Sequence, residues 1–206
     1  TGSGRAPGHL LDQFSLSERD GALRLVTTLD GTGTPMPIEP GDGMAIEDRA
    51  AFGASSARLT VLDTDGALDE IGHLDGMGIG EQVQSVRFLD DVAYVVTFRQ
   101  TDPLYAIDLS NPRAPQLLGQ LKIPGFSEYL HPVGDGLLLG VGRQVDPDTG
   151  MDEGLKISLF DVADPARMTE IDQIVLPTAS SEVSFDHRAF LWDPTRSHAV
   201  IPVEGF

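Results

Sequence analysis

The stretch "PLYAIDLSNPRAPQLLGQL", residues 103–121, decides the fold of this chain. An apolar run ends at Asp108, a short turn with Pro112 follows, and a second apolar run begins directly after the turn. Two other segments have the same order and an aligned aspartate: residues 57–74 with Asp63 and residues 155–174 with Asp161. Strand, aspartate, turn and strand therefore form a unit that recurs along the chain.

A second hairpin precedes each of these units, at residues 10–28, 85–98 and 128–142, and a fourth such hairpin is found at 187–203. Four antiparallel strands repeated every 40–50 residues or so are typical of a β-propeller blade. No sustained helical periodicity competes with this pattern. The sequence predicts an all-β chain, a β-propeller with about three and a half four-stranded blades, at approximately 9–75, 84–123, 126–177 and, for the half blade, 186–204.

The recurring aspartate has a structural role in this scheme. At the end of a third strand, its short side chain can accept a backbone N–H from the following turn, and a proline four residues on presets φ for the next strand. Two segments interrupt the repeat between second and third strands, at 30–53 and 144–153, and we expect both to be exposed insertions.

Half a blade leaves an open sheet edge, so the 206 residues are not expected to close a ring alone. We expect the chain to be a fragment of a larger ring. Two copies could also associate as a homodimer, in which three and a half blades from each would complete seven.

Net charge excludes one large class of partners. Fourteen basic residues against 32 acidic ones give a formal charge of -18, which repels nucleic acid phosphates. The absence of cysteine excludes disulfides and thiolate metal sites. No run of about twenty apolar residues occurs in the sequence.

The segment "IPGFSEYLHPVGDG", residues 123–136, gathers chemistry-bearing side chains in one place. Its Glu128, Tyr129 and His131, with His187 from the fourth hairpin, are candidate ligand-binding residues, because first strands of blades line the central channel of a propeller. The structural alternative is a corner between two blades, with Pro124-Gly125 ending an outer strand and Phe126 and Tyr129 packed between sheets.

Further candidates stand apart from this segment. Arg99 can anchor a carboxylate ligand, and both it and Arg87 can instead pair with a neighbouring acid. Asp146, Asp148 and Asp152 lie around Gly150 as a candidate calcium loop, although the EF-hand spacing is missing and a solvated hairpin tip explains them as well. No nucleophile elbow, phosphate loop or dinucleotide motif occurs, and we predict no cofactor.

Residues 85–132, 154–165 and 186–194 resemble bacterial and archaeal secreted proteins with a C-terminal β-propeller domain, which are distantly similar to the tryptophan-aspartate repeat propellers. Weaker likeness extends back to "LDQFSL" and "ALRLVTT". The resemblance implies a propeller architecture and an exported or membrane-anchored setting outside the cell or at the cell envelope. It brings no established reaction and no catalytic residues.

Two functional hypotheses follow. The first is an exported binding or scaffolding module at the cell envelope that holds a protein, peptide or glycan, because the blade repeat carries no catalytic signature. The second is a metal-dependent hydrolase or lyase with carboxylates and His131 converging on the channel. The first is preferred, which makes an enzymatic role the less favoured of the two.

Overall fold

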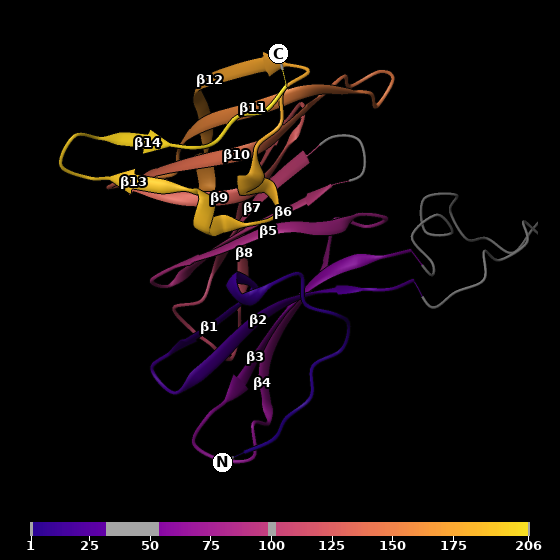
Figure 1. Ribbon diagram of the computed structural model, residues 1–206. Helices are drawn as coiled ribbons and strands as arrows, with labels where there is room; N and C mark the ends of the chain where they lie inside the picture. The colour runs from indigo at the N-terminus through magenta and orange to yellow at the C-terminus, as the bar shows by residue number, and fades with distance from the viewer. Residues whose placement is uncertain (1, 32–53, 99–101, 206) are drawn as a thin grey trace, which may run out of the picture.

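The computed structural model describes residues 2–31, 54–98 and 102–205, and it confirms the all-β propeller architecture. Within these ranges, three four-stranded antiparallel sheets hold their strands in chain order (Figure 1). The first blade contains β1 (Leu16–Arg19), β2 (Ala22–Leu29), β3 (Ser56–Asp63) and β4 (Glu70–Met77). The second contains β5 (Gln82–Leu89), β6 (Val92–Phe98), β7 (Asp102–Asp108) and β8 (Gln116–Ile123). The third contains β9 (Phe126–Gly134), β10 (Leu137–Val145), β11 (Asp152–Asp161) and β12 (Thr169–Pro177).

The chain after β12 contains a two-stranded sheet where a half blade was expected, formed by β13 (Leu191–Asp193) and β14 (His198–Val200). In the described part of the chain, four short 3₁₀ helices accompany the strands: η1 (Gln13–Ser15), η2 (Pro165–Arg167), η3 (Glu182–Ser184) and η4 (His187–Ala189). Among the described residues, no helix has the length and apolarity needed to span a membrane. Candidate residue His187 is the first residue of η4. It therefore lies outside any first strand, where the sequence had placed it.

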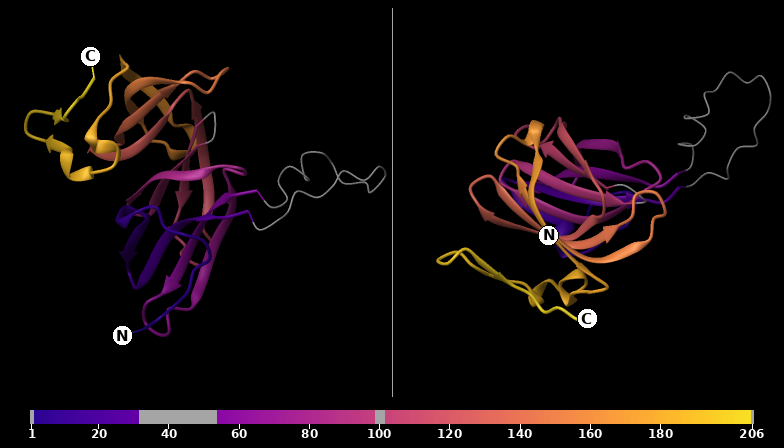
Figure 2. Two further views of the ribbon diagram at one scale, coloured as in Figure 1. Left: turned by 45° about the vertical axis from the view of Figure 1, so that its right-hand side comes forward. Right: turned by 90° about the horizontal axis from the view of Figure 1, so that it is seen from above.

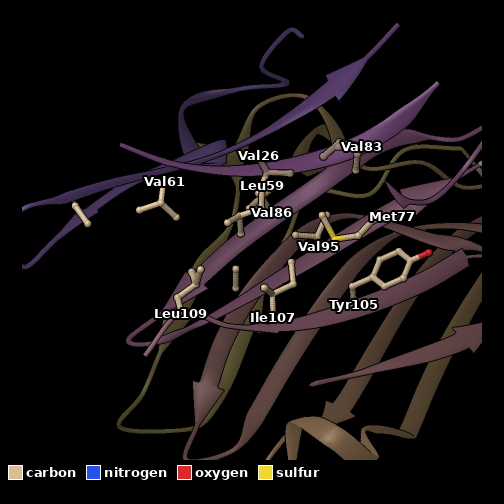
Figure 3. Packing of buried hydrophobic residues seen from close by; sticks show 13 residues of the cluster. Val26, Leu59, Val61, Met77, Val83, Val86, Val95, Tyr105, Ile107 and Leu109 are labelled. Carbon is tan, nitrogen blue, oxygen red and sulfur yellow. The ribbon is translucent and has the colours of Figure 1, made fainter. Parts of the chain in front are cut away.

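The blades stack face to face, from the indigo first blade to the orange third (Figures 1 and 2). The middle blade shows why its strands are apolar on both faces. In β6, Ala93 and Val95 belong to the core shared with the first blade, which Figure 3 shows, whereas Tyr94 and Val96 belong to the core shared with the third blade. Since side chains alternate along a strand, one run of apolar residues supplies both interfaces.

The repeated aspartates close the turns as the sequence predicted. Oδ1 of each side chain accepts the backbone N–H two residues on, at 2.9 Å for Asp63, 2.8 Å for Asp108 and 3.0 Å for Asp161. Because the carboxylate satisfies a donor that the turn would otherwise leave free, its position fixes where each third strand ends.

Outer strands carry a second repeated feature. Gly72 in β4 pairs with Val61, and Gly119 in β8 pairs with Ala106, so each glycine lies opposite the residue two before the repeated turn aspartate of its own blade. A Cβ built on Gly72 would meet the Pro112 carbonyl oxygen at 2.3 Å, and one on Gly119 would meet that of Pro165 at 2.7 Å. Each glycine therefore admits the turn of the next blade.

The corner at residues 123–136 forms as expected. Strand β8 ends at Ile123, β9 begins at Phe126, and the ring of Phe126 stacks on Phe98 of the second blade with centroids 4.1 Å apart. Lys156, which is buried, donates from Nζ to the Pro124 carbonyl at 2.9 Å and pairs with Glu170. This corner therefore fixes the start of β9 and the side chains that β9 carries.

Of the two expected insertions, the one at residues 144–153 forms a hairpin tip between β10 and β11. The other falls between β2 and β3, and residues 32–53 of it lie outside the described part of the chain.

Candidate functional site

A cleft of about 660 Å³ lies where three distant parts of the chain meet. The chain after β12 returns beside β9 (gold in Figure 1), while η1 approaches β5 from the other end of the chain. The cleft is lined by Leu11, Asp12, Gln13, Phe14, Gln84, Glu128, Ser184, Phe185, Asp186, His187 and Arg188. Since β5 and β9 are first strands of adjacent blades, the cleft opens at their inner edge.

An aromatic cluster forms one side of this region and joins the same three segments. It consists of Phe14, Tyr129, His131, His187, Phe190 and Trp192. The His187 ring lies 4.9 Å from that of Phe14 and 4.7 Å from that of Tyr129, measured between centroids. The tilted and edge-on packing of these rings holds η1 and η4 against β9.

Arg87 of β5 supplies the cation of the cluster. Its guanidinium carbon lies 4.7 Å from the Phe14 ring centroid and 5.3 Å from that of Tyr129, and Nε donates to the Leu130 carbonyl at 2.8 Å. The sequence suggested pairing with an acid; the observed partners are two ring faces and a carbonyl. A cation over an aromatic face is attracted by the ring quadrupole, so Arg87 ties the second blade to the third.

Both histidines of the cluster resist protonation. Burial, with Arg87 adding to it, lowers the pKa of His131. Burial also lowers the pKa of His187, although Asp12, whose Oδ2 lies 3.6 Å from Nδ1, opposes the change. Burial raises the pKa of Tyr129, whose hydroxyl lies 2.8 Å from His131 Nδ1. At about pH 7 the region therefore contains neutral imidazoles beside a protonated phenol.

Glu128 lies in the wall of the cleft, and burial raises the pKa of its carboxyl group. The Ser184 hydroxyl and Arg143 oppose this rise, the hydroxyl from nearby but without the geometry of a full hydrogen bond. Within residues 2–31, 54–98 and 102–205, neither Glu128 Oε2 nor Ser184 Oγ has a hydrogen-bond partner, although both atoms are buried. The Glu128 carboxyl and the Ser184 hydroxyl are therefore neighbours in the wall of the cleft.

Two of the three candidate calcium ligands, Asp146 and Asp152, have structural roles. Asp146 accepts from the backbone N–H of Asp148 and Thr149 at 3.0 and 2.7 Å, which lowers its pKa. Asp152 pairs with Arg143 at the base of the hairpin. In the part of the chain that the structure describes, no group of three acidic or histidine side chains is placed to hold a metal ion. The structure thus gives Asp146 a role in the turn and Asp152 a role in an ion pair.

Four of the candidate ligand-binding residues come together: Glu128 and His187 in the cleft, and Tyr129 and His131 in the adjoining cluster. Arg99 lies outside the described residues. Sequence reasoning missed a second set of residues that complete the site: Asp12, Phe14, Ser184, Phe185 and Phe190. Asp12 alone left a local signal, since it caps η1 with Oδ1 2.8 Å from the Phe14 nitrogen.

Stacked four-stranded blades with a cleft at their inner edge define a propeller-type domain, and comparison with known proteins agrees. Residues 1–205 match the family model described as "Beta propeller domain", so the chain belongs to this family. An uncharacterised protein of Methanocaldococcus jannaschii is 39% identical over 207 residues, covering 97% of this chain and 29% of that protein. One of Archaeoglobus fulgidus is 38% identical over 201 residues, covering 98% and 27%. The chain thus spans under a third of these relatives.

Proposed function

We propose that this propeller domain is a binding module that holds a segment of a polypeptide partner in the cleft between η1, β5, β9 and η4. The observation that carries the proposal is the cleft itself, which is built from side chains of three distant segments. Its volume, about 660 Å³, is within the range of sites that bind small ligands or a few side chains.

The rim of the cleft favours a polypeptide. Phe185 is 81% exposed and Leu11 is 47% exposed, although both are large apolar residues. Beside them lie hydrogen-bonding side chains, among them Gln13 and Gln84. Apolar anchors surrounded by polar groups are the usual composition of a protein-binding surface. An exported setting at the cell envelope, implied by the family resemblance, fits such a role, and cell fractionation would test it.

A peptide display selection on the purified chain tests the proposal. Gln13 is exposed in the cleft lining, so Gln13→Trp should fill the cleft and weaken the selected peptides about tenfold or more. Gln116→Trp is the matched control, because Gln116 is also exposed but lies on outer strand β8. Selection of no peptide, or of peptides that bind both variants equally well, would contradict the proposal. A domain that binds only glycans would select no peptide.

A further inference from the structure

We infer that the terminal segment, residues 178–205, has an acid-sensitive contact with β9 and detaches from it as the pH falls from about 7 to about 5. His131 of β9 and His187 of η4 are the two groups that make the contact sensitive to pH. Since residues 184–188 line the cleft, detachment also takes the cleft apart. The detachment follows from the packing of the chain, and only its effect on ligand binding rests on the proposed function.

Both histidines lie within the contact. Measured between centroids, the His131 ring is 4.6 Å from that of Phe190 and 6.5 Å from that of Trp192, both in the terminal segment. The His187 ring, from the terminal segment, is 4.7 Å from that of Tyr129 in β9. Each imidazole therefore faces a ring of the opposite partner, and a proton added to either one acts directly on the contact.

A positive charge is already present beside both imidazoles. The Arg87 guanidinium carbon lies 5.3 Å from the Tyr129 ring centroid, between the two histidines that pack on Tyr129. Burial lowers the pKa of His131 and that of His187, and Arg87 lowers both further. A proton on either ring would add a second positive charge to a partly buried region, where salt screens repulsion less than it does at the surface.

The groups around His131 do not compensate such a charge. Tyr129 presents its hydroxyl, 2.8 Å from Nδ1, and β10 presents Leu139 as the paired residue, while the terminal segment presents aromatic rings. In the part of the chain that the structure describes, no carboxylate raises the pKa of His131. His131 is therefore the main acid-sensitive group of the contact.

His187 is compensated in part. Asp12 of η1, with Oδ2 3.6 Å from Nδ1, and Asp186 at the N-cap of η4 raise its pKa, as does the Glu128 backbone, but burial outweighs them. The Glu128 carboxyl also acts against the acid effect. Burial raises its pKa, so it takes up a proton more readily in the docked state, at the acidic end of the range.

The direction of the pH effect follows from the lowered pKa of each histidine. An imidazole whose pKa is lower in the docked state than in the detached state holds fewer protons when docked, so its contribution to docking is complete above about pH 7. This contribution falls as the pH drops through about 6.5, the ordinary pKa of histidine, and keeps falling until the docked imidazole is protonated as well.

The terminal segment is held less firmly than the blades hold one another. Its buried apolar residues in the described chain are Ala179 and Val183, both small, whereas Phe190, Ile201 and Val203 are only partly buried. Segments with few buried apolar contacts open at a lower free energy than the core. Protonation of the histidines should therefore detach this segment while the three blades stay together.

Trp192 is the one tryptophan of the sequence, so its fluorescence reports on the terminal segment. Acrylamide should quench it about twofold more strongly at about pH 5.5 than at about pH 7.5, because detachment exposes a ring that is half-buried when docked. His131→Phe keeps a ring without a titrating group, and His131→Asn keeps an acceptor for the Tyr129 hydroxyl. Since the two variants change the packing differently, both should lose the pH effect only if the proton on His131 causes it.

His198→Phe is the matched control, since His198 belongs to the same segment but is exposed in β14. It should keep the pH effect. Equal quenching at the two pH values, or a pH effect that persists in both His131 variants, would overturn the inference. Loss of the β-sheet circular dichroism signal in parallel with the rise in quenching would also overturn it, because the whole chain would then be unfolding in acid.

The quenching experiment uses no peptide, so it decides the inference separately from the proposed function. If the segment detaches in acid but display-selected peptides bind equally well at both pH values, the inference stands and the proposed binding site is wrong. If quenching and peptide binding are both independent of pH, the inference fails and the proposed function stands.

Discussion

Phe160→Ala is expected to lower the free energy of unfolding by about 3–5 kcal/mol. Phe160 lies in β11 and is 1% exposed, within the core that joins the second and third blades. Its removal loses apolar burial and also leaves a cavity, because Leu130, Leu138 and the facing strands can close only part of the space. Urea denaturation followed by circular dichroism measures the change.

The matched control for Phe160→Ala is Phe185→Ala, which makes the same substitution at a ring that is 81% exposed. We expect its effect on stability to stay within about 0.5 kcal/mol. Comparable losses for the two variants would show that the second interblade core does not hold the blades together as described.

Gly119→Val is expected to destabilise the chain by about 1–3 kcal/mol, because the new side chain meets backbone that cannot rotate away. The added Cβ would lie 2.7 Å from the Pro165 carbonyl oxygen and 3.0 Å from Ala166 Cα, so β8 and the turn of the third blade must separate. Gly72→Val should destabilise the chain in the same way, because its Cβ would lie 2.3 Å from the Pro112 carbonyl oxygen. Thermal melts of both variants provide the measurement.

The third blade contains an internal control for these glycine variants. Asp172 in β12 pairs with Leu159, two residues before Asp161, and therefore occupies the position of Gly72 and Gly119. It is exposed, so Asp172→Val should change stability by less than about 0.5 kcal/mol. If Asp172→Val were as damaging as Gly119→Val, a general loss in outer strands would explain both, and the packing of blade turns on glycine would not.

The blades could be predicted from sequence because their determinants are local. Short apolar runs bounded by turn residues specify the strands, and an aspartate at each third-strand end closes its own turn within two residues, as at Asp108. The roles of Gly72 and Gly119 could not be predicted from the sequence, since the carbonyl oxygen that each one admits belongs to the next blade. Sequence proximity gives no sign of that contact.

The candidate site could be predicted only where several of its residues lie together in one segment. Glu128, Tyr129 and His131 lie close together in β9, so the sequence indicated them as one candidate site. Asp12 and Ser184 join them only through folding, since they lie more than a hundred and more than fifty residues from Glu128 in the sequence. Arg87 likewise has ring faces as partners that no spacing rule identifies. Tertiary contacts between distant segments therefore define this cleft, and the structure was needed to show them.

Amide hydrogen exchange with and without a display-selected peptide tests most directly whether the inner-edge cleft is the binding surface. Bound peptide should slow exchange in residues 11–14 and 184–188 and around Gln84 and Glu128, which line the cleft, and should leave the outer strands β4, β8 and β12 unchanged. Slowed exchange confined to those outer strands, with none at the cleft, would contradict the account.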